Sequence, residues 1–206
     1  MILNRTNLEL AAFASDDETR PALRSVHIGR GYTEATDGHV MMRVAIPDLD
    51  ANEFPSIEGM DCTSNGKEAL IPADAAKTMA KAIPRKSTLP ILQNLVWDAR
   101  DSTDTELKFA VTDLDTVQRF NPRPVEGPYP PVDNVIPKDN RVFQISVNAS
   151  KLAKALAFVA KHTEDFQNNR VRLTFYGPNR AVRLDAKSKD GQQIIGLVMP
   201  LRLMED

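Results

Sequence analysis

The chain has 206 residues, of which 42% are apolar and 26% charged, as is ordinary for a globular protein. Its formal net charge of −2 excludes a broadly basic surface, so any contact with nucleic acid must come from a local basic stripe. The one cysteine, Cys62, excludes an internal disulfide and a cysteine-cluster metal site. No apolar run is long enough to cross a bilayer, and the N-terminus lacks a signal-peptide pattern, so we expect a cytoplasmic protein.

The chain begins with a predicted strand over residues 1–4, an amphipathic helix, and alternating strands within residues 19–44. The core-facing positions of this helix are Leu8, Ala11, Ala12 and Ser15. The same order of elements returns with a strand over 68–71, a second helix, and alternating strands within 88–120. The core-facing positions of the second helix are Ala75, Ala76, Met79 and Ala80.

A third copy of this pattern starts at Arg141. Val142, Ile145 and Val147 predict its first strand, and Asn148 is a good residue to cap the helix that follows. The apolar positions of that helix are Leu152, Ala155, Leu156 and Val159. Three strands are then predicted over 171–176, 181–186 and 193–199. The unit βαβββ therefore occurs three times.

Matching residues support an internal repeat between the first two copies. The pairs are Pro21 with Pro90, Leu23 with Leu92, Thr36-Asp37 with Thr112-Asp113, and Arg43 with Arg119. The spacing differs only by a hairpin insert from Asp101 to Glu106.

The repeats predict the domain organisation. Residues 1–125 form one domain of two units, 1–60 and 66–125, and residues 141–206 form the third unit. Residues 121–140 carry six prolines, which can neither continue a sheet ladder nor sit inside a helix. Residues 126–140 are therefore an extended linker.

Three local motifs resemble the bacterial DNA sliding clamp, the beta subunit of DNA polymerase III. They are Ala35-Thr36-Asp37-Gly38-His39, the linker segment from Gly127 to Pro137, and the C-terminal run from Leu197 to Leu203. Thr88-Leu89-Pro90-Ile91-Leu92 looks like a motif of the first domain of that family. The resemblance implies an α+β DNA-clamp fold of three βαβββ repeats, with one full clamp-like domain and a half domain.

The chain also departs from the family pattern. A family member has three domains of two units each, whereas this sequence has three units. Tyr129 stands where the family linker has phenylalanine, and Asp133-Asn134 replaces a basic pair.

The resemblance further implies a hydrophobic pocket that receives short peptides of the Gln-x-x-Leu-Phe type. The residues it places in this pocket are Thr36, Gly38, His39, Val40, Met41, Pro130, Asn134, Val135, Leu197, Val198, Met199, Pro200, Leu201 and Arg202. A concave apolar site with a few fixed polar groups suits such a ligand. The alternative is that they are ordinary core and strand residues.

Basic residues gather on two of the predicted helices. They are Lys77, Lys81, Arg85 and Lys86 on and after the second helix, and Lys151, Lys154 and Lys161 on the third. In the family such helices face DNA and contact phosphates without reading sequence. The alternative is a solvated helix face, and Asp16-Asp17-Glu18 at the end of the first helix weakens the case for DNA.

The sequence offers little for catalysis, and we expect no catalytic residue, no metal site and no cofactor. Asp37-x-His39 and Asp113-x-Asp115 contain possible metal ligands or acid–base pairs. They occupy equivalent points of a repeat where a strand turns, and aspartate favours such turns. We therefore interpret both as turn residues.

The predicted function is that of a clamp-like replication processivity factor that docks partner peptides and encircles or cradles duplex DNA. The predicted partners are a DNA polymerase or other replication and repair proteins, duplex DNA without sequence preference, and further copies of the chain. The alternative is a truncated interaction module, an adaptor or decoy, that binds clamp-motif peptides without encircling DNA.

Overall fold

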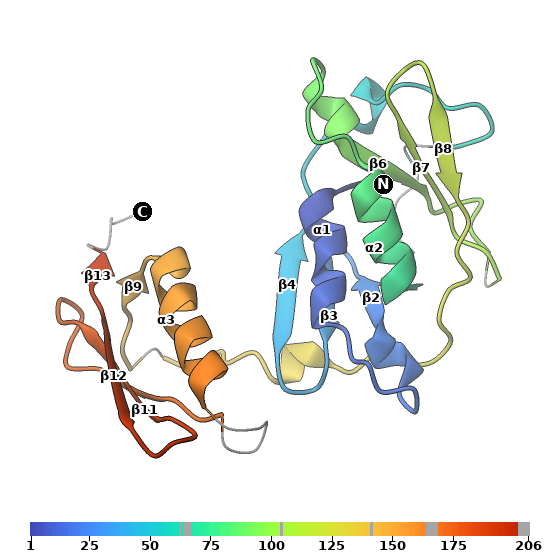
Figure 1. The fold of residues 1–206 in the computed structure, drawn as a ribbon. Helices are drawn as coiled ribbons and strands as arrows, with labels where there is room; N and C mark the ends of the chain where they lie inside the picture. Colours follow the sequence, from blue (N-terminus) through green and yellow to red (C-terminus); the bar gives the residue numbers. More distant parts are fainter. Residues whose placement is uncertain (62, 64–66, 104, 141, 164–168, 202–206) are drawn as a thin grey trace. The chain divides into compact units, whose positions relative to one another are not determined.

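The computed structural model describes the chain except residues 62, 64–66, 104, 141, 164–168 and 202–206. It forms two compact units, Met1–Asp133 and Asn134–Asp206. The division falls inside the segment predicted to be a linker. The first and last parts of the chain thus lie in separate units, which are coloured blue to yellow and yellow to red in Figure 1.

The first unit contains two βαβββ repeats. The first repeat comprises β1 (Ile2–Asn4), α1 (Arg5–Glu9), β2 (Ser25–Ile28), β3 (Tyr32–Thr36) and β4 (Met41–Ala45). The second repeat comprises β5 (Ala69–Pro72), α2 (Ala73–Ala82), β6 (Asn94–Asp98), β7 (Lys108–Thr112) and β8 (Val117–Phe120). Short 3₁₀ turns precede β2 and β6 at Pro21–Arg24 and Pro90–Gln93, and two more lie at Ala51–Glu53 and Val132–Asn134. Each of the first two begins at a proline, whose fixed φ suits the first position of such a turn.

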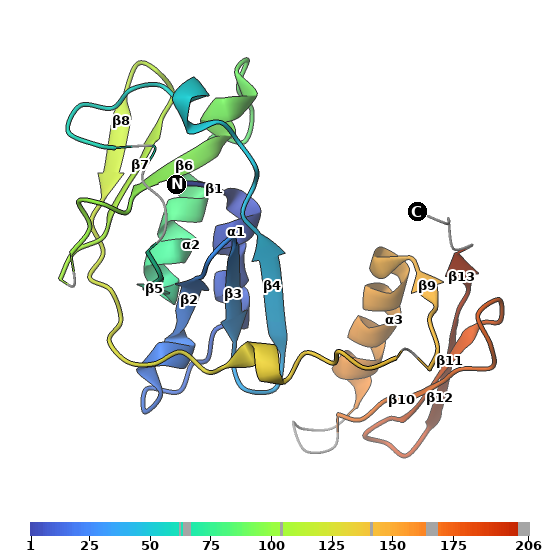
Figure 2. The same ribbon diagram turned by 180° about the vertical axis from the view of Figure 1, so that it is seen from behind.

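The two repeats exchange their first strands. β1 pairs antiparallel with β6 of the second repeat, and β5 pairs antiparallel with β2 of the first. The sheets are therefore β4-β3-β2-β5 and β1-β6-β7-β8, each of mixed origin. Figure 1 shows α1 and α2 side by side in this unit, and Figure 2 shows the same arrangement from behind. Neither repeat has a complete sheet of its own.

One hydrophobic core joins the two repeats. Its buried members come from both helices and both sheets and include Leu3, Leu8, Val26, Ile28, Ile71, Met79, Leu95, Trp97 and Phe109. Trp97 and Phe109 stack with their ring centroids 5.8 Å apart. Burial of this many large apolar side chains is the main stabilising term of the unit.

The first helix is shorter than its apolar spacing predicts. α1 ends at Glu9 and continues as a 3₁₀ turn over Leu10–Phe13. The backbone then turns, and the N–H of Ser15 donates to the carbonyl of Leu23 at 2.8 Å. Asn4 and Asn7 form a reciprocal capping box at the start of the helix, with N···O distances of 3.0 and 3.1 Å.

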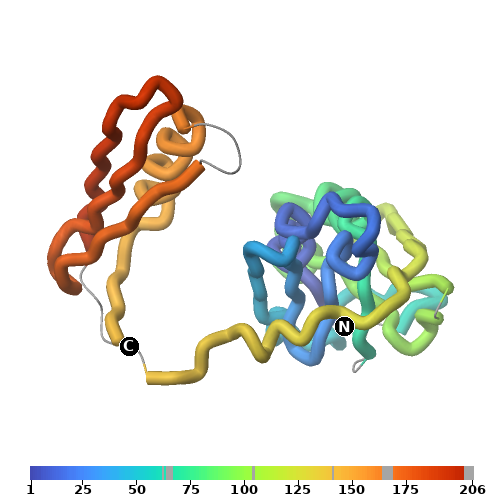
Figure 3. The backbone as a smooth tube through the Cα atoms, turned by 90° about the horizontal axis from the view of Figure 1, so that it is seen from below, coloured from blue at the N-terminus to red at the C-terminus, as the bar shows by residue number. Residues whose placement is uncertain are grey.

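The second unit contains one βαβββ repeat. It comprises β9 (Ser146–Val147), α3 (Ala149–His162), β10 (Arg172–Thr174), β11 (Val182–Lys187) and β12 (Gln193–Val198), followed by β13 (Pro200–Leu201). Asn148 caps α3 as predicted, because its side chain accepts from the N–H of Lys151 at 3.0 Å. Figure 3 shows the backbone of the third repeat in orange and red.

The first strand of the third repeat is shorter than predicted. β9 covers two residues and pairs with β13, while Val142 is fully exposed. The sheet β10-β11-β12 contains no strand from another repeat within the described residues. The prediction of three βαβββ repeats in an α+β fold is confirmed, whereas the strand over 142–147 was overestimated because alternation alone does not supply a pairing partner.

Each repeat of the first unit has an equivalent turn before its last strand, but the residue with positive φ differs between the two turns. Gly38 and Leu114 both have positive φ, of 94° and 82°, at equivalent positions. Glycine adopts this conformation freely, whereas a leucine pays a steric cost of about 1 kcal/mol or more.

Replacing Leu114 by glycine is therefore expected to raise the free energy of unfolding of the first unit by up to about 1 kcal/mol. The Leu114 side chain is exposed, so little burial is lost. The fluorescence of Trp97, the single tryptophan of the chain, reports unfolding in urea. Gly38→Leu is the matched control and should destabilise; a destabilised Leu114→Gly would contradict the assignment.

Candidate functional site

The turn between β3 and β4 carries the first group of predicted pocket residues. The Thr36 hydroxyl donates to the carbonyl of Val40 at 2.7 Å and accepts from the N–H of Gly38 at 3.0 Å. The Asp37 carboxylate accepts from the N–H groups of His39 and Val40 at 2.7 and 2.8 Å. These backbone hydrogen bonds, that of Val40 foremost, lower the pKa of Asp37. Thr36 and Asp37 thus build the turn rather than reach a ligand.

The turn between β7 and β8 repeats this arrangement. The Thr112 hydroxyl donates to the carbonyl of Thr116 at 2.8 Å, and Asp113 accepts from the N–H and hydroxyl of Thr116 at 2.7 and 2.9 Å. The pKa of Asp113 is lowered by these same bonds. Within the described residues no group of three or more histidine, cysteine, aspartate or glutamate side chains is placed to hold a metal ion. Both aspartates have the chemistry of turn residues.

The turn between β3 and β4 exposes both apolar and polar residues. Gly38, His39 and Val40 are exposed, Met41 is half-buried, and Thr36 is buried. Pro130 is half-buried in the segment that follows the second repeat. The first unit therefore presents five of its six predicted pocket residues at least partly to solvent.

A buried ionic cluster lies beside this turn, and the sequence had not indicated it. The carboxylate of Glu34 lies 2.9 Å from Nδ1 of His27 and 2.7 Å from Nη2 of Arg43. Arg43 also contacts Asp133 at 2.6 Å. The pairings His27↔Glu34 and Glu34↔Arg43 across β2, β3 and β4 bring these side chains together. Only the strand register, which local spacing does not fix, could have revealed them.

Tyr129 packs onto this cluster. Its ring stacks on that of His27 with a centroid distance of 4.6 Å, and burial raises its pKa. Arg43 also lies over the ring of Tyr32, 4.0 Å from its centroid. Burial by itself lowers the pKa of Arg43. The hydrogen bonds that Arg43 donates to Asp133 and Glu34, together with their negative charges, have the larger effect, so the pKa is raised overall. Tyr129 and Asp133, two departures from the family motif, thus hold the segment after the second repeat on the first unit.

The outer face of the third repeat carries a row of exposed apolar side chains. Leu197, Met199 and Leu201 are 66%, 68% and 50% exposed, and Ile195 continues the row. Val198 between them is buried in the core of the unit, opposite Val182. Asn134 and Val135 are exposed, Pro200 is half-buried, and Arg202 lies outside the described residues. The alternation places the row on one face of β12 and β13.

The seven basic residues predicted to face DNA are all exposed. Lys77 and Lys81 project from α2, Arg85 and Lys86 follow it, and Lys151, Lys154 and Lys161 project from α3. Lys77 lies 3.3 Å from Asp74 in the first turn of α2. Asp17, after the first helix, is held by hydrogen bonds from Thr19 and an ion pair with Arg20, which lower its pKa to about 2. Asp17 thus remains charged at neutral pH.

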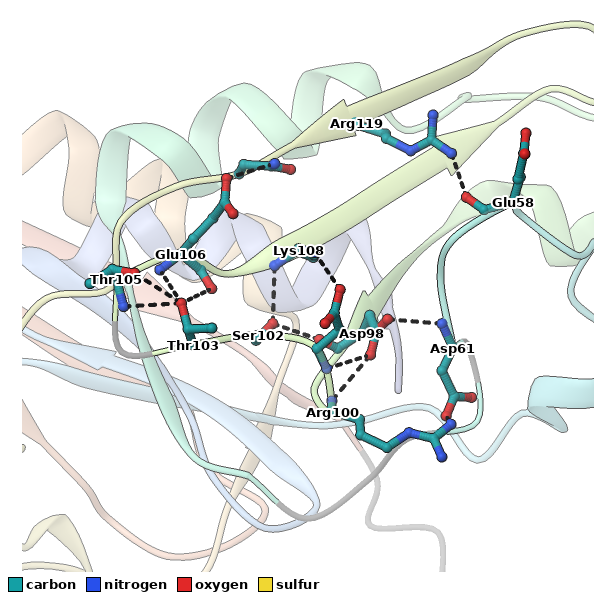
Figure 4. A network of polar contacts seen from close by, with 12 residues as sticks. Glu58, Asp61, Asp98, Arg100, Ser102, Thr103, Thr105, Glu106, Lys108 and Arg119 are labelled. Carbon is teal, nitrogen blue, oxygen red and sulfur yellow. Dashed lines mark hydrogen bonds and ion pairs between the residues drawn. The ribbon is translucent and has the colours of Figure 1, made fainter.

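Polar contacts in the β6–β7 hairpin stabilise the fold of the hairpin. Asp98 accepts from the N–H groups of Asp61, Arg100 and Asp101 at 2.9 to 3.1 Å, as Figure 4 shows for part of this network. The Ser102 hydroxyl accepts from the indole N–H of Trp97 at 2.8 Å. The insert from Asp101 to Glu106 is thereby attached to the core. None of the helices in the described ranges is both long and apolar enough to cross a membrane.

The fold is similar to that of sliding clamps of known structure. DNA polymerase sliding clamp from Bacillus subtilis matches it with a TM-score of 0.69 at 18% identity, over 97% of this chain and 48% of that chain. The beta chain of DNA polymerase III from Streptococcus pneumoniae matches with a TM-score of 0.68 at 19% identity, over 100% and 50%. No family model matches the chain.

The sequence supports the same relationship. The chain is 29% identical over 198 residues to the Beta sliding clamp of Synechocystis sp., an alignment that covers 89% of this chain and 47% of that protein. The resemblance to the bacterial beta sliding clamp is confirmed, and the chain spans about half the length of the relatives it matches.

The lowered pKa of Asp37 predicts a pH-dependent effect of Asp37→Asn. The pKa of Asp37 is lower in the folded protein than in the unfolded chain. The stability that the carboxylate contributes is therefore fully present when the pH lies above the pKa of the unfolded chain, and it is lost as the pH falls through the pKa of the folded protein. The variant should therefore lose more stability relative to the native protein at pH 7 than at a pH of about 2, measured by urea unfolding followed by Trp97 fluorescence.

Asp113→Asn should behave in the same way, because Asp113 caps the equivalent turn. Addition of Mg²⁺ or Zn²⁺ should leave both stabilities unchanged. An equal loss at both pH values, or stabilisation by metal that disappears in the variants, would contradict the structural role.

Proposed function

We propose that the chain is a non-catalytic, clamp-like factor of DNA replication that binds short hydrophobic peptides of a polymerase or of other replication and repair proteins. The exposed row Leu197, Met199 and Leu201 is the observation that carries this proposal. Contiguous exposed apolar side chains on a small unit are characteristic of a binding surface.

The chemistry of the row suits a peptide. Met199 is flexible and polarizable, so it adapts to different apolar anchors. β12 is the edge of the sheet β10-β11-β12 in the described part of the unit, and an edge strand offers backbone groups to an extended ligand. Apolar anchors and backbone hydrogen bonds together suit a short segment with alternating large side chains.

The first unit carries a second group of residues that we propose for peptide binding. His39, Val40 and Met41 lie at the turn that Thr36 and Asp37 build, and Pro130 lies in the segment held by Tyr129 and Asp133. Rigid support is useful because a preorganised surface loses less entropy on binding. We propose that Asn134, Val135 and Arg202 take part as well, and that Val198 contributes through its backbone.

The peptide proposal is tested with Met199→Ala combined with Leu201→Ala. Removal of two apolar anchors should weaken binding of a Gln-x-x-Leu-Phe peptide by at least about a hundredfold, because each buried large side chain contributes about 1.5–3 kcal/mol. Isothermal titration calorimetry measures the affinity.

The matched control removes the same side-chain types elsewhere. Met42 and Leu89 are exposed in the first unit and outside the proposed surface, so Met42→Ala with Leu89→Ala should bind the peptide normally. A native protein that gives no binding heat and no displacement of a labelled peptide would refute the proposal.

DNA contact is the second part of the proposed function. The exposed lysines of α2 and α3 are suited to contact phosphates without reading bases, and the low net charge limits this attraction to those faces. We propose that these faces cradle or encircle duplex DNA.

Lys77→Ala with Lys81→Ala should weaken duplex binding equally for different sequences. The slope of log affinity against log salt should become shallower by about 0.9 for each phosphate that the variant no longer neutralises. Lys187→Ala with Lys189→Ala removes two exposed lysines of the third repeat as a control. Retention on circular but not linear DNA would indicate encirclement; peptide binding without any DNA retention would instead establish the adaptor alternative.

A further inference from the structure

The first unit shows how two βαβββ repeats complete each other. Leu3, which directly precedes the helix cap Asn4, pairs with Leu95 of the other repeat. Ile71 precedes the cap position Pro72 and pairs with Val26. All four of these apolar side chains are fully buried. Each repeat is thus both a donor of a strand and an acceptor of one.

The third repeat has the same donor and the same acceptor. Val147 directly precedes the helix cap Asn148, as Leu3 precedes Asn4. Leu173 of β10 lies opposite Leu184, on the face that α3 covers, and Val171 precedes it by two residues on that face. β10 corresponds to β2 and β6, each of which accepts a first strand from the other repeat along its outer edge. The outer edge of β10 has no partner strand in the described sheet.

The apolar face of α3 is also less buried than the equivalent face of α2. Counted from the cap, Leu152, Ala155 and Leu156 occupy the positions of Ala76, Met79 and Ala80. The α2 residues are buried, in part because α1 packs beside them, whereas the three α3 residues are only half-buried.

Two larger apolar side chains of this repeat are exposed to solvent. Leu173 is 39% exposed and Phe158 is 56% exposed. Phe158 stands at the position of Ala82, which packs against the shared core of the first unit. Lys154 and Lys161 correspond to Thr78 and Arg85, which stay exposed there, so these two charges do not oppose the same packing. Lys151 stands at the position of Ala75, which is half-buried against the core, and its long apolar stem can lie along that surface while the ammonium group reaches solvent.

We propose that two copies of the chain complete each other's third repeat by exchanging first strands. β9 of each copy pairs antiparallel with β10 of the other, with Val147 facing the apolar side of β10, and the two α3 helices pack together. The interface is two-fold symmetric, because one surface carries both donor and acceptor. β9 already pairs with β13 along one edge, and its second edge receives the new strand. The inference is independent of the proposed peptide binding.

A cysteine scan tests the register. In a Cys62→Ser background, chains with Val147→Cys are mixed with chains carrying Val171→Cys, Leu173→Cys or Arg172→Cys. Neighbouring residues of a strand point to opposite faces. Oxidation should therefore link the mixed chains through position 171 or 173 and not through 172. Absence of any linked dimer, or equal linkage at all three positions, overturns the proposal.

Native mass spectrometry tests the assembly itself. The native protein should be dimeric, and Leu173→Lys should raise the dimer dissociation constant by at least about tenfold. Leu197→Lys, on the opposite face of the same sheet, should leave the dimer intact while impairing the peptide titration. A strict monomer at high concentration, as expected if another protein covers this face, overturns the proposal, and so does a dimer that Leu173→Lys leaves unchanged. Trp97 fluorescence confirms that the first unit is folded in each variant.

Discussion

The exchange of β1 and β5 is the constraint on which the first unit depends. Each short strand pairs with the other repeat, and the two helices that follow these strands pack against each other. Leu3 and Ile71 are buried at the centre of one core as a result. The N-terminal ammonium group also donates to the carbonyl of Trp97, at 2.9 Å, across nearly half of the chain. Separation of the repeats would expose the inner face of both sheets, so neither forms a core alone.

The same constraint explains why the third repeat differs from the other two while its sequence pattern is the same. Its helix is capped by asparagine and its sheet alternates apolar and polar residues, so local structure forms. What the described part of the unit lacks is a second repeat to bury Leu173 and the inner side of α3. If the third repeat of each of two chains serves as the second repeat for the other, the six repeats of the two chains assemble into three complete clamp-like domains.

The proposed binding surfaces and the stabilising interactions use different side chains in this molecule. Thr36, Asp37 and the Glu34–Arg43–Asp133 cluster use their polar groups on the protein itself. The exposed side chains that we propose for partner contacts are Val40, Leu197, Met199 and Leu201, which are apolar, and the lysines of α2 and α3. A chain with a net charge of −2 can therefore present basic helix faces without a basic surface overall.

The sequence by itself determined the three repeats, the Asn148 cap of α3, the apolar faces of α2 and α3, and the turn role of Asp37 and Asp113. These features depend on residues close together in the chain, so composition and spacing report them directly. Tertiary structure alone decided which strand pairs with which, that Val198 is buried while Leu197 and Met199 are exposed, and that His27, Glu34 and Arg43 form one cluster. Strand pairing joins residues far apart in the chain, and a shift of one residue reverses the faces of a strand. For this reason the motif could locate the row near the C-terminus, while only the fold showed which of its side chains are available to bind.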